Sequence, residues 1–422
     1  MTGRPFGGEV QRAVADAHRR EWAFVLAATT RTTRDLDLAE EAVQDAYVSA
    51  LTAWARDGVP SAPGAWLTTA ARRNALNALK RGQVLRTKLP LLLEREPAEE
   101  DDPMETGGPD TIPDDRLRLV FTCCHPALGG EAQVALTLRL VCGVATGDIA
   151  QAFLVSEPAM AARLTRAKKK IAAARIPYVV PAAADLPDRL DAVLGVIHLL
   201  YTLGHTAPSG EDLVRADLAE RAIDLARMLR DLLPEPEVLG LLALLVVNHA
   251  RRTTRTDAQG RLLRLADQDR TAWDREAIAE GDRLVLAALD AGPPGRYTLQ
   301  AAIAALHAEA ETYDRTDWAQ IVALYDALLE AWPSPVVALN RAIALGMVAG
   351  PAAALAEVER LEDDGALARY HYLPATKADL LVRLDRRAEA VAAYRAALDL
   401  ADNDAERTFL AERLAECAGV AH

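Results

Sequence analysis

The segment GDIAQAFLVSEPAMAARLTRAKKKI, residues 147–171, contains two helical patterns separated by a tight turn. The second pattern begins at Ser156, a residue type favoured at the N-cap, with Pro158 in its first turn. Apolar side chains then recur at helical spacing: Met160, Leu164 and Ile171. Two short helices that pack across such a turn are typical of a helix-turn-helix.

The second helix of this segment is strongly basic. Arg163, Arg166 and Lys170 share one side of it, and no acid interrupts the run after Glu157. In a helix-turn-helix, the N-terminal residues of the second helix contact base edges and later cations contact phosphates. The alternative is an ordinary solvated helix surface. We predict DNA contacts from Ser156, Glu157, Ala159, Met160, Arg163, Arg166, Lys168, Lys169 and Lys170.

The charge of the 422-residue chain, −13 in total, is unevenly spread. Residues 1–85 carry +2 and residues 114–176 carry +4, with nine basic against five acidic side chains in the second block. Residues 86–113 carry −5, and residues 177–422 carry −14. Two slightly basic blocks in an otherwise acidic chain indicate a small module for nucleic acid.

Composition predicts an all-α fold. Hydrophobic residues make up 51% of the chain, aromatic residues 5% and charged residues 26%, and long β-branched runs are scarce. We predict a helical domain over 1–85, a flexible acidic linker over 86–113, a second helical domain over 114–176 and helical hairpins over 177–422. Towards the end, two segments echo each other at an offset of 36, close to the tetratricopeptide period.

Several classes of protein lack support in the sequence. No window approaches the roughly 18–20 apolar residues that span a bilayer, and the N-terminus has no signal-peptide h-region. Four cysteines give neither a disulfide framework nor a metal pattern, and no catalytic motif is present. We therefore expect a cytoplasmic protein without membrane contact, cofactor or metal, and not an enzyme.

Three segments resemble a known family. The block 114–171 resembles the −35-reading region 4 of an extracytoplasmic-function sigma factor, of the group with a long tetratricopeptide-like C-terminal extension. DLDLAEEAVQDAYVSALTAW (35–54) is similar to region 2.2, and APGAWLTTAARRNALNALKR (62–81) is similar to regions 2.3–2.4. The extension matches in segments such as ERAIDLARML and PSPVVALNRAIAL. The resemblance thus covers nearly the whole chain.

The resemblance implies core RNA polymerase and promoter DNA as partners, with contacts to the β′ clamp helices and the β flap. It implies that the polymerase contacts come from Asp37, Glu40, Glu41, Gln44 and Asp45. Cations and amides of the 62–81 segment would hold the −10 strand. The residues expected there are Trp66, Arg72, Arg73, Asn74, Asn77, Lys80 and Arg81, although a lone Trp before a helix is more often core.

The C-terminal extension departs from its family at one signature. Where the family has roughly Phe-Asn-Glu-Gly-Tyr, this chain has Tyr201 to His205, which keeps only an aromatic at the first position and Gly204. Gly204 suits a helix C′ position. The resemblance implies that the extension governs activity in place of a separate anti-sigma factor, and leaves open whether it inhibits or is required.

Two other hypotheses compete with the sigma factor. The first is a DNA-binding transcriptional regulator that uses the helical array as a sensor and never engages polymerase. The second is a helical scaffold with vestigial N-terminal domains. A regulator has no need of the 35–54 segment, and the basic helix at 163–170 argues against a mere scaffold.

Overall fold

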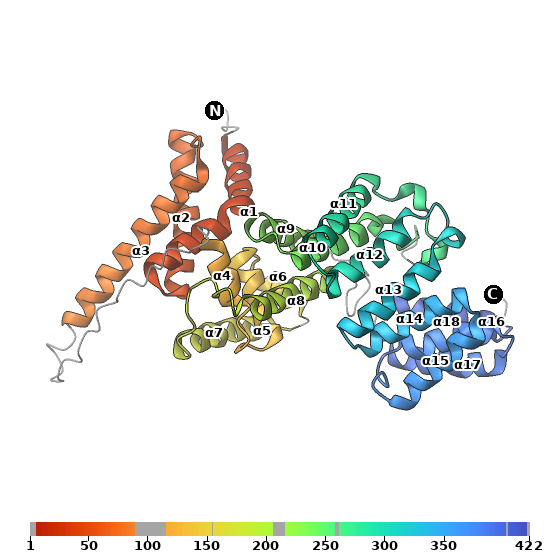
Figure 1. Ribbon diagram of the computed structural model, residues 1–422. Coiled ribbons are helices and arrows are strands. Elements are labelled where there is room, and N and C mark those ends of the chain that lie inside the picture. Colours follow the sequence, from red (N-terminus) through yellow and green to blue (C-terminus); the bar gives the residue numbers. More distant parts are fainter. Residues whose placement is uncertain are drawn as a thin grey trace. The chain divides into compact units, whose positions relative to one another are not determined.

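The computed structural model describes residues 6–88, 115–153, 155–205, 216–257, 261–401 and 404–419. Within these residues the chain is helical, and the β pairing there is one isolated bridge between Thr256 and Leu262. The prediction of an all-α fold is confirmed (Figure 1). The chain divides into two compact units, Met1–Val196 and Ile197–His422. No described helix is both long and apolar enough to span a membrane.

The first unit begins with a three-helix bundle in which each helix packs on the other two. Gly58, at a positive φ of 86°, ends the second helix, and Pro63 begins the third. The third helix runs to Lys88, into the predicted linker, and the rest of that linker lies outside the described residues. The three helices are α1 (Phe6–Thr33), α2 (Leu36–Asp57) and α3 (Pro63–Lys88).

A second group of helices completes the first unit. Its central segment is a π-helix, η2, that continues directly from α5 and is almost wholly buried. Phe121, Leu140 and Met160 are among its fully buried side chains. We call this group the α4–α7 module: α4 (Asp115–Cys123), α5 (Gly130–Leu136), η2 (Thr137–Val141), α6 (Thr146–Ala152) and α7 (Glu157–Ala173). α6 and α7 pack against each other, and α7 also contacts α5.

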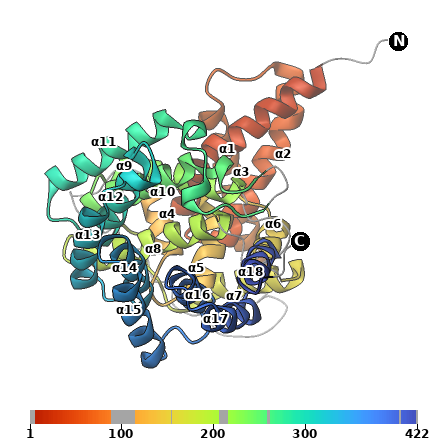
Figure 2. The same cartoon turned by 90° about the vertical axis from the view of Figure 1, so that its right-hand side faces the viewer.

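Helices continue through the second unit, and most of them pack chiefly on their neighbours along the chain (Figure 2). The helices that begin at Pro351 and Arg387 start 36 residues apart, the offset of the sequence echo. The helices, with α8 crossing the unit boundary, are α8 (Leu186–His205), α9 (Ala216–Leu232), α10 (Pro236–Ala250), α11 (Arg275–Ala291), α12 (Arg296–Glu309), α13 (Trp318–Ala331), α14 (Pro335–Val348), α15 (Pro351–Asp364), α16 (Tyr372–Arg383), α17 (Arg387–Leu400) and α18 (Asp404–Cys417).

The apolar helix α10 is the centre around which α9, α11 and α12 pack. It also caps α12, because the Glu237 carboxylate accepts hydrogen bonds from the backbone N–H groups of Tyr297 at 2.8 Å and Thr298 at 3.1 Å. Gly240 makes this approach possible, since a Cβ there would lie 2.6 Å from the Thr298 nitrogen. The acids beside Trp273 and Trp318 are helix caps too, at the starts of α11 and α13.

Candidate functional site

The acidic N-terminal end of α2 is fixed by its cap. Asp35 accepts hydrogen bonds from the backbone N–H groups of Asp37 at 2.9 Å and Leu38 at 3.1 Å. Asp37 and Glu40 follow in the first turns, three residues apart, so they project from one side of the helix. The helix dipole favours carboxylates at this end. The sequence thus places two acids together at the start of α2.

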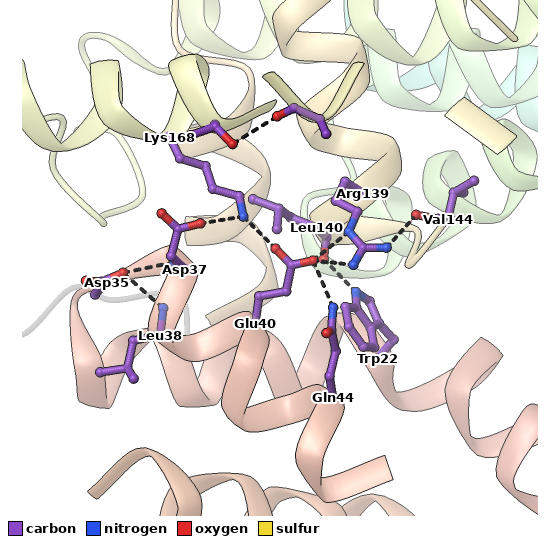
Figure 3. A network of polar contacts seen from close by, with 12 residues as sticks. Trp22, Asp35, Asp37, Leu38, Glu40, Gln44, Arg139, Leu140, Val144 and Lys168 are labelled. Carbon is purple, nitrogen blue, oxygen red and sulfur yellow. Dashed lines mark hydrogen bonds and ion pairs between the residues drawn. The ribbon is translucent and has the colours of Figure 1, made fainter. Parts of the chain in front are cut away.

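Glu40 is the centre of a polar network that joins α2 to the α4–α7 module (Figure 3). Its Oε1 accepts a hydrogen bond from Arg139 Nε at 2.5 Å and one from Gln44 Nε2 at 3.2 Å. Lys168 Nζ, from α7, donates to Glu40 Oε2 at 2.6 Å and to Asp37 Oδ1 at 2.7 Å. We call Asp37, Glu40, Arg139 and Lys168 the Glu40 network.

Glu40, Lys168 and Arg139 are largely withdrawn from water, whereas Asp37 is exposed. Only 9% of the Glu40 side chain and 11% of the Lys168 side chain are exposed. Burial by itself lowers the pKa of Lys168, but the hydrogen bonds to Asp37 and Glu40 outweigh it, so this pKa lies above its usual value. Lys168 is therefore charged at neutral pH. Removing one member of such a buried group leaves a charge without compensation, which typically costs about 3–5 kcal/mol.

Neutral contacts between α1 and the module surround this network. Trp22 Nε1, which is buried, donates to the backbone oxygen of Leu140 at 3.0 Å. Gly143, at a φ of +67°, lets the module approach, since a Cβ there would lie about 3.0 Å from the Trp22 ring. Further along α1, Arg31 forms an ion pair with the buried Asp115 at 3.0 Å. The bundle and the module therefore share one continuous packed interface.

The cations of α7 do not all face the same way. Arg166, Lys169 and Lys170 are exposed, whereas Lys168 faces α2. Arg163 is half-buried, pairs with Glu131 at 2.8 Å and lies over the ring of Phe153. The remaining residues predicted to contact DNA also divide into exposed and buried ones. Ser156, at the N-cap position but without a capping side-chain bond, Glu157 and Ala159 are exposed.

Met160 is wrongly predicted as a DNA contact. Its side chain is fully buried in the module. It occupies the inner side of α7 together with Leu164, Ala167 and Ile171, which are also buried. An apolar residue on that side completes the core and has no route to a base edge.

The residues predicted for the −10 strand divide between the bundle interior and the surface of α3. Asn74 Nδ2 donates to the backbone oxygen of Ala42 at 3.2 Å and so joins α3 to α2 instead of facing a base. Half-buried Trp66 lies edge-on to buried Trp54, with ring centroids 5.7 Å apart, as expected for a core residue. Arg72 is half-buried. The exposed members are Arg73, Asn77, Lys80 and Arg81.

One face of α2 remains open. Glu41, Gln44 and Asp45, predicted to contact polymerase, are exposed there. Two large apolar side chains continue the same face at helical spacing: Val48 is 64% exposed and Leu51 is 43% exposed. We call these five residues the α2 outer face. Asp37 and Glu40 lie at its N-terminal edge, where both pair with Lys168; Glu40 is buried there, whereas 64% of the Asp37 side chain is exposed.

The signature of the extension lies at the end of α8. Tyr201 is buried, and burial raises the pKa of its hydroxyl. Gly204 lies inside the helix, which runs to His205, so the predicted C′ position is wrong. The helix continues one residue past the glycine, and Gly204 is buried. The side chain of His205 lies outside the described residues.

Sequence reasoning missed Trp22 and Arg139. Arg139 carried a signal, because it is a lone cation in the apolar run LTLRLV (136–141), and a buried guanidinium needs an acid partner. Trp22 carried no such signal, since a tryptophan on an amphipathic helix is expected in any core.

Among the described residues no cluster of His, Cys, Asp or Glu could hold a metal. Burial raises the pKa of the Cys124 thiol to about 12.

Comparisons with known proteins place the site in a family. A family model described as Sigma-70 region 2 matches residues 15–84, the span that contains α2. This match supports a sigma factor of the sigma-70 type. It suggests a role in transcription initiation and implies binding to core RNA polymerase.

Matches beyond residues 15–84 carry no functional description. A model described as a family of unknown function (DUF6596) matches residues 189–289. The chain is 44% identical over 393 residues to an uncharacterized protein of Rhizobium meliloti (strain 1021), which covers 92% of each chain. The two proteins belong to one family. No solved structure matches the chain.

The Trp22 hydrogen bond can be measured against a matched tryptophan. Trp22→Phe removes the donor to Leu140 and leaves a buried carbonyl unsatisfied, so we expect the free energy of unfolding to fall by about 1–3 kcal/mol more than in Trp54→Phe. Trp54 is a suitable control, because it is equally buried and its Nε1 has no partner. Urea unfolding followed by circular dichroism gives both values. Equal losses would mean that the bond contributes nothing.

Proposed function

We propose that this protein is a promoter-specificity factor that engages core RNA polymerase through the α2 outer face. The observation that carries the proposal is the composition of that face: three polar or acidic side chains beside exposed Val48 and Leu51, within the region 2 match. Exposed apolar residues rimmed by polar ones are typical of a protein-binding surface. The charges would steer and orient a basic partner helix, and the apolar pair would add buried area.

Promoter DNA is the second proposed partner. The exposed cations and amide of α3 would hold the −10 strand, and those of α7 would contact phosphates near the −35 element. Ser156, Glu157 and Ala159 at the start of α7 are exposed and would reach base edges. Binding energy on the unpaired strand would open the promoter.

The finer assignments belong to the same proposal. The protein would act in the cytoplasm as an extracytoplasmic-function sigma factor with domains 1–85 and 114–176, joined by the 86–113 linker. Its tetratricopeptide-like extension, residues 177–422, would control activity without a separate anti-sigma factor. Successive packed hairpins such as α14–α15 and α16–α17 support an array of this kind.

Run-off transcription with purified core polymerase tests this function. We expect promoter-specific transcripts from the full chain, from a form that ends at His205, or from both. Transcripts from the short form alone would show that the extension inhibits, and transcripts from the full chain alone would show that it is required. A DNA-binding regulator that never engages polymerase would give no transcripts with either form, and the proposal would then be wrong.

DNA contact by α7 has its own test. Arg166→Ala should weaken binding of a random-sequence DNA duplex and reduce the slope of log K against log salt by about 1, because one phosphate contact is lost. Arg315→Ala is the control, since it removes an exposed arginine of the second unit that pairs with Glu311. Fluorescence anisotropy at several salt concentrations gives both slopes. An unchanged slope in Arg166→Ala would remove this residue from the interface.

A further inference from the structure

Residues predicted for two different partners are bonded to each other in this chain. Lys168 is among the cations predicted for DNA, and Asp37 and Glu40 are among the acids predicted for polymerase. Lys168 Nζ lies 2.7 Å from Asp37 Oδ1 and 2.6 Å from Glu40 Oε2 (Figure 3). Lys168 therefore occupies the position at Asp37 and Glu40 that is predicted for polymerase, and these two carboxylates occupy the position at Lys168 that is predicted for a DNA phosphate.

We propose that Lys168 is an intramolecular latch that covers the N-terminal edge of the α2 outer face until core polymerase displaces it. The inference rests on the proposed function, because it takes polymerase as the partner of α2. Displacement would free the Lys168 ammonium for a DNA phosphate. Engagement of polymerase and release of this cation for DNA would then be one coupled step.

The charges make displacement an exchange of partners. Glu40 is buried while the latch is closed, so a displacing surface that brings its own cation to Asp37 and Glu40 offsets the loss of Lys168. Arg139 remains anchored on its own module, since its Nη1 donates to the backbone oxygen of Val144 at 3.1 Å. Lys168, by contrast, pairs with two carboxylates that both lie on α2. Lys168 therefore loses both of these ion pairs when the module moves away from α2.

The remainder of the α2 outer face permits this exchange to begin. Glu41, Gln44 and Asp45 are exposed while the latch is closed. A basic partner helix can make its first contacts there and then extend towards Asp37 and Glu40. Exposed charges of this kind raise association rates and orient the encounter. The closed chain would accordingly bind polymerase, but more weakly than an opened one.

The latch predicts that removal of its cation strengthens polymerase binding. Lys168→Met keeps the length of the side chain and both carboxylates, and Glu40 keeps Arg139, so the chain should fold. If most chains are in the closed state, destabilising that state raises the fraction of chains that can bind polymerase by the same factor. We therefore expect the Kd for purified core polymerase to fall at least tenfold. Lys168→Gln should behave alike. Anisotropy of labelled chain, without DNA, gives the Kd, and circular dichroism checks the fold.

Two controls separate the latch from a general effect of charge. Arg175→Met removes an exposed cation that follows α7 and should leave the Kd unchanged. Lys168→Arg keeps the charge and should retain the weaker affinity of the unmodified chain. If that chain binds polymerase and neither neutral Lys168 variant binds more tightly, the latch is wrong and the proposed function stands. If no form binds polymerase, the proposed function fails and the latch fails with it.

Discussion

The structure of the first unit depends on a carboxylate that is nine-tenths withdrawn from water. Glu40 must be compensated by cations, and neither of those cations comes from its own helix bundle: Arg139 lies in η2 and Lys168 in α7. These ion pairs fix the position of the α4–α7 module relative to the bundle. Apolar packing around Trp22 supplies contact area, but area alone does not select a position. The left-handed Gly143 supplies the space for that packing.

Local features of the sequence specify where helices begin and end. Asp35, Gly58 and Pro63 mark element boundaries because capping and φ restriction act within a few residues. The long-range pairing of Glu40 with Arg139, 99 residues apart, could not be predicted, since nothing local specifies which acid meets which cation. A lone arginine in an apolar run predicts only that some partner exists.

The sequence named candidate site residues, but it could not tell which of them are exposed. A polar residue on an amphipathic helix can face solvent or a neighbouring carbonyl, and the sequence does not distinguish the two. Asn74 bonds to the Ala42 oxygen, while Asn77, one turn further along α3, is exposed. On α7, Met160 belonged to the apolar stripe and its place in the core followed from periodicity. Lys168 and Lys169 are neighbours in sequence, yet only Lys168 meets α2.

Hydrogen exchange of the full chain, alone and with core polymerase, tests the central claim most directly. The account predicts that polymerase slows exchange in α2 and at the same time speeds exchange across residues 137–144, because the module loses its packing against α1 and α2. Slower exchange in α2 with unchanged protection across residues 137–144 would contradict it. In that case polymerase would bind α2 without opening the Glu40 network.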